Sequence, residues 1–195
     1  NGCNGTASIT ITENPLPAPT VTVAETSGTT NNDGILCSGD AATLSTGVFS
    51  SYVWSTGDLT QTTTVTTAGT YTVTVTDVNG CDGTAVRTIT VNPLAVPVIG
   101  IVETSGNIDN DGILCSGDAA TLDAGNYVSY LWSGGQTTQT ISTSVGGDYT
   151  VTVTDTNGCD GTAVATITIN SLPTPTILPT ETSGVANNDG VICIG

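Results

Sequence analysis

Cysteines and carboxylates are the side chains of this sequence that could carry chemistry. The 195-residue chain has six cysteines and 17 aspartates and glutamates, against one Arg or Lys residue in total and no histidine. Carboxylates bind hard cations such as calcium, and regularly placed thiols without histidine favour disulfides over a zinc site. The chemistry to look for is therefore crosslinking in an oxidising compartment and cation binding.

The charge excludes several classes of partner. A formal net charge of -16 excludes nucleic acid, because neutralising phosphates needs Lys and Arg, and it excludes a polybasic grip on anionic lipid. Apolar residues make up 37% of the chain, enough to form folded sheet rather than remain disordered. No apolar run is long enough to span a membrane, so we expect no direct membrane insertion of this segment.

The cysteines recur at a fixed distance and reveal a repeat. One kind follows Asp-Gly-Ile-Leu, as in Cys37 and Cys115, and the other follows Asn-Gly, as in Cys81 and Cys159; equivalent residues are 78 apart. The surrounding sequence keeps the same period, which predicts tandem repeats. We expect both ends of the chain to lie inside a longer polypeptide. The predicted domains are 1–14, the last strand of a preceding repeat; 15–92 and 93–170, two whole repeats; and 171–195, the first strand and loop of a following repeat.

The sequence of each repeat predicts β-strands and no helix. Residues 70–76 alternate with period two and place Val73 and Val75 on one face. The pair Asn79-Gly80 then predicts a tight hairpin, whose two-residue turn needs positive φ at both positions. Roughly seven short strands per repeat, separated by Gly, Asn and Asp, predict an all-β fold of tandem immunoglobulin-like Greek-key β-sandwiches.

Two aromatic positions fit this fold. Trp54 and its equivalent Trp132 stand where the third strand would carry a core tryptophan. Tyr71 and its equivalent Tyr149 stand at the place of a tyrosine corner, before the last hairpin. We expect both kinds to pack in the core rather than to stack on sugars.

Two pairings of the cysteines are open. If Cys37 extends strand B, it lies about 20 Å from Cys81 at the opposite end of the same sandwich, too far for a disulfide. In a head-to-tail array, the base of one repeat meets the hairpin of the next. The preferred pairing is therefore Cys37 with Cys159, with Cys81 and Cys115 bonded to repeats outside this sequence. The alternative is Cys37–Cys81 and Cys115–Cys159, since the long loop before strand B could carry Cys37 across the end.

The loop before the first kind of cysteine is rich in oxygen ligands. In the second repeat, Asn107, Asp109, Asp111 and Asp118 occupy positions one, three, five and twelve, with Gly at six. This is the spacing of a calcium loop, although position twelve is Asp rather than Glu and no helices flank it. The sequence thus predicts a structural Ca²⁺, and the alternative is an Asn-Asp-Gly turn with solvated carboxylates. A weaker set stands in the first repeat: Thr29, Asn31, Asp33 and Asp40. Further donors would be Glu25, or Asp155 and Asp160 across the junction.

The order of two signatures resembles a known family. Trp54-Ser-Thr-Gly57, followed by the run from Val75 to Cys81 (Val-Thr-Asp-Val-Asn-Gly-Cys), resembles the immunoglobulin-like, PKD-like and SprB-type repeats of very large Bacteroidetes surface proteins. The resemblance covers both whole repeats and both partial ones. It implies an exported cell-surface filament or adhesin, delivered by type IX secretion and sometimes used in gliding. Residues 48–52 depart from the Gly-Gly-x-Pro-Tyr of the SprB-type pattern, a departure that concerns gliding alone.

These observations predict a structural stalk, filament or adhesin segment of a large extracellular repeat protein. An enzyme is not expected, because every candidate carboxylate recurs at the repeat period and a catalytic site copied into each repeat serves no purpose. The alternative function is a carbohydrate-binding surface module, which would need an exposed aromatic platform. The expected partners are neighbouring repeats of the same chain, identical chains in a fibre, and surface glycans or other cells.

Overall fold

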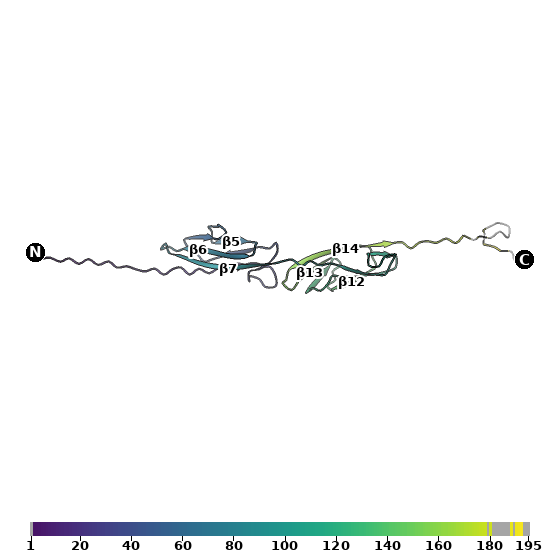
Figure 1. Ribbon diagram of the computed structural model, residues 1–195, viewed down its shortest axis with the longest axis horizontal. Helices are drawn as coiled ribbons and strands as arrows, with labels where there is room; N and C mark the ends of the chain where they lie inside the picture. The colour runs from purple at the N-terminus through teal and green to yellow at the C-terminus, as the bar shows by residue number, and fades with distance from the viewer. Residues whose placement is uncertain (1, 179, 181–187, 189, 193–195) are drawn as a thin grey trace. The chain divides into compact units, whose positions relative to one another are not determined.

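The computed structural model describes residues 2–178, 180, 188 and 190–192. Within this part of the chain there are strands and no helix (Figure 1), so none of it forms a helix able to cross a membrane. Most of the predicted loop of a third repeat, including Cys193, lies outside the described residues.

Seven strands form the first repeat, and their equivalents form the second. The strands of the first repeat are β1 (Thr22–Ala24), β2 (Ile35–Cys37), β3 (Ala42–Ser45), β4 (Ser51–Trp54), β5 (Thr62–Val65), β6 (Gly69–Thr76) and β7 (Asp82–Asn92). Those of the second are β8 (Gly100–Val102), β9 (Ile113–Cys115), β10 (Ala120–Asp123), β11 (Ser129–Trp132), β12 (Thr140–Thr143), β13 (Gly147–Thr154) and β14 (Asp160–Asn170). Each strand of the second set begins 78 residues after its counterpart.

The strands of the first repeat form two sheets. One has the order β1-β3-β5 and the other β2-β7-β6-β4. Neighbours pair antiparallel except β2 and β7, which run parallel with Cys37 opposite Asn92. The second repeat has the same orders, β12-β10-β8 and β11-β13-β14-β9. This is an immunoglobulin-like sandwich, in which β2 is an extra short strand on the sheet that holds the last hairpin. The all-β prediction is confirmed.

The core of the first sandwich lies between its two sheets. The period-two pattern of β6 buries Val73 and Val75 completely, as predicted. The core residues, which come from both sheets, are Leu36, Ala42, Leu44, Trp54, Val65, Val73, Val75 and Ile89.

The aromatic residues take the predicted structural roles. Trp54 and Trp132 are each 2% exposed, and their indole Nε1–H groups donate to the carbonyl oxygens of Thr60 and Thr138 at 2.9 Å. The hydroxyl of Tyr71 donates to the carbonyl oxygen of Thr67 at 2.9 Å, the hydrogen bond of a tyrosine corner.

The hairpin between β6 and β7 differs from the predicted two-residue turn. Five residues, 77–81, separate the strands, and of the pair Asn79-Gly80 only Gly80 has positive φ (78°). The Asp77 carboxylate oxygen Oδ1 accepts the backbone N–H groups of Asn79 and Cys81 at 2.8 and 2.9 Å, which closes a wider loop. The two-residue turn was wrong because the Asp77 side chain closes a longer loop, in which positive φ is needed at Gly80 and not at Asn79.

The structure does not meet the condition on which the estimate of about 20 Å between Cys37 and Cys81 was based. Cys37 does not extend the following strand β3; it ends the separate strand β2, and residues 38–41 lie between them. Because β2 pairs with the end of β7, Cys37 lies beside the point where the chain leaves the first sandwich.

A matched pair of valines tests the assignment of the core. We expect Val73→Ala to lower the free energy of unfolding by about 2 kcal/mol, because it removes two buried methyl groups. Val53→Ala, at a residue of the neighbouring strand β4 that is 54% exposed, should change it by less than about 0.5 kcal/mol. Urea denaturation followed by tryptophan fluorescence measures both, and equal losses would contradict the assigned faces.

Candidate functional site

The chain passes from the first sandwich to the second through residues 93–99, which separate β7 from β8. β7 ends at Asn92, and three residues later the carbonyl oxygen of Ala95 lies so close to Gly161 that a Cβ there would overlap it. Gly161 is the second residue of β14, just beyond the hairpin that holds Cys159. The linker thus brings the end of β7 near that hairpin. Both belong to one compact unit formed by residues 1–100, 123–141 and 149–165.

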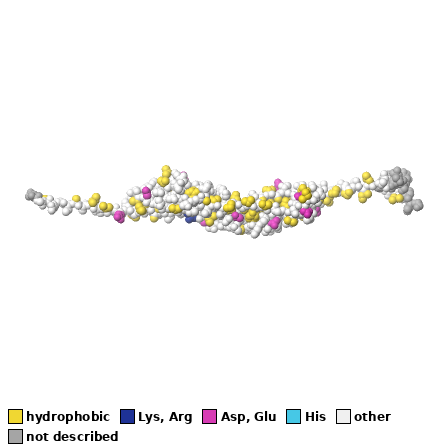
Figure 2. All heavy atoms as spheres, viewed as in Figure 1, with side chains coloured by type: hydrophobic (Ala, Val, Ile, Leu, Met, Phe, Trp, Pro, Cys, Tyr) yellow, Lys and Arg dark blue, Asp and Glu magenta, His cyan; other side chains and the backbone are white. Residues whose placement is uncertain are grey.

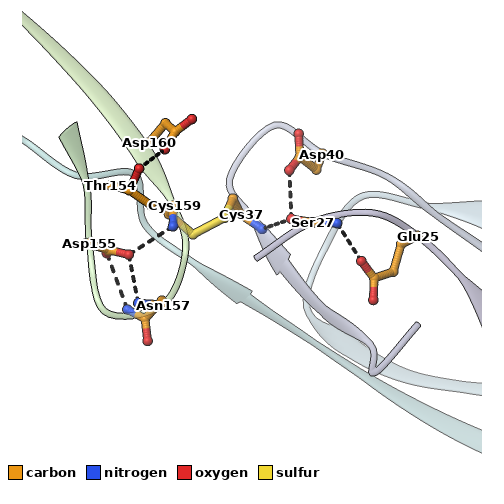
Figure 3. The surroundings of a disulfide bond; sticks show 9 residues. All are labelled: Glu25, Ser27, Cys37, Asp40, Thr154, Asp155, Asn157, Cys159 and Asp160. Atoms are coloured by element: carbon orange, nitrogen blue, oxygen red, sulfur yellow. Dashed lines mark hydrogen bonds between the residues drawn. A yellow bond between two sulfur atoms is a disulfide. The ribbon is translucent and has the colours of Figure 1, made fainter. Parts of the chain in front are cut away.

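A disulfide closes the same junction. It joins Cys37, opposite Asn92, to Cys159, with the two Cα atoms 5.5 Å apart and a separation of 122 positions in sequence (Figure 3). Both cysteines are buried, at 5% and 0% exposure. Of the two pairings that the sequence left open, the structure has the cross-repeat one. Cys81 and Cys115 are free thiols here, so their pairing with further repeats stays a prediction.

A serine fixes the loop that presents Cys37. The Ser27 hydroxyl oxygen accepts the backbone N–H of Cys37 at 2.6 Å and donates to a carboxylate oxygen of Asp40 at 2.7 Å (Figure 3). Ser27 is 5% exposed, so these bonds lie away from water. The Ser27 hydroxyl therefore joins the end of β2 and the turn after it to the loop that precedes β2.

A buried glutamate closes that loop from inside. Glu25 is 6% exposed, and its two carboxylate oxygens accept the N–H groups of Ser27 at 2.6 Å and Asp33 at 2.9 Å. The Glu25 N–H in turn donates to the side-chain oxygen of Asn32 at 3.0 Å, and Asn32 has a left-handed φ of 63°. A buried carboxylate is tolerated here because N–H donors satisfy it.

The second repeat shows that the loop forms without the disulfide. There Glu103 accepts the N–H groups of Ser105 and Asp111 at 2.6 and 3.0 Å, and Ser105 joins Asp118 to the Cys115 N–H at 2.7 and 2.6 Å. Cys115 is nevertheless unpaired. The hydrogen bonds, not the sulfur bridge, therefore shape the loop.

Hydrogen bonds to a carboxylate also shape the hairpin that carries Cys159, independently of the disulfide. The Asp155 carboxylate oxygen Oδ1 accepts the N–H groups of Asn157 at 2.8 Å and Cys159 at 2.9 Å, as Asp77 does beside the unpaired Cys81. The bond from the Cys159 N–H is the main cause that lowers the pKa of Asp155 below its usual value. Two rigid loops thus meet, which reduces the entropy lost on joining them.

The two loops touch through their backbones. A Cβ on Gly158 would lie 2.5 Å from the carbonyl carbon of Gly28 and 2.6 Å from the nitrogen of Thr29. A Cβ on Gly28 would lie 3.2 Å from the carbonyl oxygen of Asn157. Two glycines therefore allow the close approach on which the disulfide depends.

The structure does not gather the predicted calcium ligands at one point. Among the described residues, no three His, Cys, Asp or Glu side chains lie together as a metal site would require. Asp111 and Asp118 line different hollows, and their carboxylates accept hydrogen bonds from the Ile113 N–H at 2.8 Å and the Ser105 hydroxyl at 2.7 Å. Asn107 lies beside Asp111, whereas Asp109 is exposed and lines neither hollow.

The weaker set in the first repeat has the same arrangement. Asp33 accepts the Ile35 N–H at 2.7 Å, Asp40 accepts from Ser27, and Asn31 is exposed. The turn interpretation accounts for these contacts without an ion, and calcium binding stays a prediction from spacing alone.

Sequence reasoning missed the residues that shape the junction. Glu25 was considered as an extra calcium ligand rather than as an acceptor of backbone N–H groups, and Ser27, Gly28 and Gly158 were not singled out. A signal was present, because Glu-Thr-Ser-Gly precedes the cysteine loop in each repeat, at residues 25–28 and 103–106.

No family model and no curated protein matches this sequence. Solved structures give distant likenesses. Murine CEACAM1b is 12% identical over 78% of this chain and 100% of its own, with a TM-score of 0.33. A Ca²⁺-stabilised adhesin with which an Antarctic bacterium binds ice is 16% identical over 82% of this chain and 50% of its own, with a TM-score of 0.45. The Bacteroides ovatus SGBP-B, solved with a mixed-linkage heptasaccharide, is 19% identical over 69% and 42%, with a TM-score of 0.24. At these identities and scores, the likenesses assign neither a family nor a function.

Two equivalent glycines test the backbone contact. Gly158 and Gly80 have nearly the same left-handed φ (77° and 78°), so alanine adds similar local strain at either position. Only Gly158 faces another loop, whereas a Cβ on Gly80 would meet nothing. After refolding in a glutathione buffer, we expect Gly158→Ala to lose most of the Cys37–Cys159 bond and Gly80→Ala to keep it.

Mass spectrometry of unreduced peptides, cut beside aspartates, measures the fraction of Cys37 that is bonded to Cys159. Equal fractions in the two glycine variants would show that the loops do not need to approach so closely.

The buried glutamate of the second repeat predicts a dependence on pH. Hydrogen bonds, first among them that from the Ser105 N–H, lower the pKa of Glu103 below its value in the unfolded chain. A lowered folded-state pKa stabilises the fold fully above the unfolded value of about 4.3, and this stabilisation is lost as the pH falls through the folded value. Glu103→Gln should therefore be less stable than the wild type at neutral pH, and the difference should shrink in acid.

Urea denaturation at a series of pH values measures this difference. Glu13→Gln is the control, because Glu13 is exposed in the segment before β1. A Glu103→Gln deficit that stays constant from neutral to acidic pH would argue against a role for the charge.

Proposed function

We propose that this chain is a stalk or adhesin segment of a large extracellular repeat protein, stiffened by disulfides where successive repeats meet. The observation that carries the proposal is the buried Cys37–Cys159 bond beside the linker that follows Asn92. A single linker leaves two domains free to turn about it. A second covalent connection at the same place removes most of that freedom.

The bond also determines which residues carry a pulling force. Tension applied at the two ends passes from Cys37 through the sulfur bridge to Cys159, and the 122-residue separation between them is bypassed. The bypassed stretch includes β3 to β7 and the linker itself. Much of the first sandwich and the junction are thereby protected from being pulled out into extended chain, a property suited to a stalk under tension.

The disulfide and the acidic surface support an extracellular location. Buried structural disulfides persist in oxidising surroundings and are rare in reducing cytosol. Figure 2 shows several acidic side chains and one basic side chain on the visible face. Such a surface, at a net charge of -16, keeps a long repeat protein soluble and resists association between sheet edges.

The alternative, a carbohydrate-binding surface module, has less support. Both tryptophans are 2% exposed and therefore cannot stack on a sugar. The second repeat does have a hollow lined by Tyr127 and Asp155, the pairing of an aromatic face with an acceptor that sugars use. Binding on a glycan array that Tyr127→Ala abolishes would favour this alternative over the stalk.

Single-molecule pulling tests the mechanical role. With the disulfide intact, residues 38–158 should never extend, whereas reduction or Cys37→Ser should lengthen the fully unfolded chain by about 400 Å, from the 122-residue separation at about 3.5 Å each. Cys81→Ser is the control and should change nothing, because Cys81 is unpaired. An equal extended length before and after reduction would refute the proposed path of force.

A further inference from the structure

Each of the two hairpins contains a pair of residues that reacts spontaneously in water. Asn79-Gly80 and Asn157-Gly158 stand at equivalent places, and both asparagines are exposed. A glycine after asparagine has no side chain to hinder attack by its backbone nitrogen on the asparagine amide. Burial therefore does not protect these pairs, and whether they survive depends on how the hairpin holds the reacting groups.

The reaction is deamidation through a cyclic imide. The glycine nitrogen attacks the amide carbon Cγ of asparagine, a C–N bond forms, the amide C–N bond breaks, and the glycine proton passes through solvent to the ammonia that leaves. Water then opens the imide ring at either of its carbonyl carbons. One opening gives aspartate, and the other gives isoaspartate, whose backbone runs through the former side chain and is longer by a methylene group.

The first hairpin holds both reacting groups away from each other. The Gly80 N–H donates to the backbone carbonyl oxygen of Asp77 at 3.2 Å, so the attacking nitrogen is directed toward Asp77. The side-chain Nδ2 of Asn79 donates to the carboxylate oxygen Oδ2 of Asp77 at 3.4 Å, and the Asn79 N–H donates to Oδ1 at 2.8 Å. A single aspartate thus binds the nucleophile, the leaving amide and the backbone between them.

The second hairpin has the same arrangement. The Gly158 N–H donates to the carbonyl oxygen of Asp155 at 3.1 Å. Asn157 donates to the Asp155 carboxylate through its N–H at 2.8 Å and through Nδ2 at 3.4 Å. The residue between aspartate and asparagine differs, being valine in the first hairpin and threonine in the second, so the arrangement belongs to the shared Asp-x-Asn-Gly sequence.

We infer that Asp77 and Asp155 protect Asn79 and Asn157 from deamidation, in addition to shaping the hairpins. Before the imide can form, the glycine N–H must leave the aspartate carbonyl and the asparagine amide must turn away from the carboxylate. The free energy of these hydrogen bonds is therefore added to the barrier of the reaction.

The opposite effect, catalysis by the neighbouring carboxylate, is disfavoured by its charge state. Hydrogen bonds, first among them that from the Cys81 N–H, lower the pKa of Asp77 below its usual value. A carboxylate of low pKa is a weak base toward the glycine N–H, and at neutral pH it has no proton to give to the leaving amide.

Protection has its largest consequence where two repeats meet. A Cβ on Gly28 would lie 3.2 Å from the carbonyl oxygen of Asn157, so the backbone at Asn157 lies against the loop before Cys37. Isoaspartate would lengthen the backbone at this point, and either product would add a negative charge to a chain of net charge -16. Deamidation of Asn157 should therefore displace the hairpin that carries Cys159. This inference goes beyond the proposed function, because it concerns the chemical lifetime of the hairpin and not the load that it carries.

The experiment compares two aspartate variants of the 195-residue protein. Asp77→Ala removes the acceptor, whereas Asp82→Ala removes an equal charge just after the same hairpin, where the carboxylate accepts from the Thr76 hydroxyl at 2.8 Å. Each folded protein is incubated at mildly alkaline pH, and mass spectrometry of peptic peptides measures the deamidated fraction of Asn79 and Asn157 with time. Reduced wild type unfolded in urea gives the unprotected rates.

In the folded wild type, both asparagines should deamidate at least about tenfold more slowly than in urea. Asp77→Ala should raise the Asn79 rate by about tenfold and leave the Asn157 rate unchanged, so that Asn157 reports whether the fold is intact. Asp82→Ala should match the wild type at both positions.

Asp77→Asn provides a milder variant, because its amide oxygen can still accept N–H groups, and its Asn79 rate should fall between those of the wild type and Asp77→Ala. Equal Asn79 rates in Asp77→Ala and Asp82→Ala would overturn the inference. Slower deamidation of Asn79 in Asp77→Ala than in the wild type would also overturn it, since the carboxylate would then be a catalyst of the reaction.

Discussion

Each loop of the junction depends on a carboxylate that accepts two backbone N–H groups. The acceptor is Glu25 in the loop before Cys37 and Asp155 in the hairpin before Cys159. The bonds fix turns that contain residues with left-handed backbones, and they do so in both repeats whether or not the neighbouring cysteine is paired. The sulfur bridge is thus the last step of a contact whose geometry is already present, and this lets one short sequence be reused along the chain.

Direct contact between backbones gives the junction its specificity. Side chains at an interface can move aside to admit many partners, but two peptide backbones in contact leave room for hydrogen atoms alone. Gly28 and Gly158 meet in this way, and Gly161 approaches the carbonyl oxygen of Ala95 in the linker. A hairpin with a larger residue in place of its glycine would hold the two cysteines apart, so the contact selects its partner before any bond forms.

The fold and part of the site could be predicted from the sequence. The sandwich fold could be predicted from the alternation in β6 and from the position of Trp54. A strand buried on one face has apolar residues at every second position, and this pattern is visible in the sequence. The head-to-tail geometry gave the cross-repeat pairing as one of two alternatives. The oxygen spacing around Asp109 and Asp111 could not show where those side chains point, since spacing along a chain fixes order and not convergence. The role of Glu25 was hidden for a related reason, because its partners are backbone groups common to every residue.

The burial of the sulfur bridge has a consequence for survival outside the cell. Cys37 and Cys159 enclose β3 to β7 of the first sandwich, the linker, and β8 to β13 of the second within one covalent ring. A protease that cuts the backbone once anywhere inside this ring opens it without separating the molecule into two pieces. Damage at the exposed linker, where attack by proteases is easiest, would thus leave the two sandwiches attached.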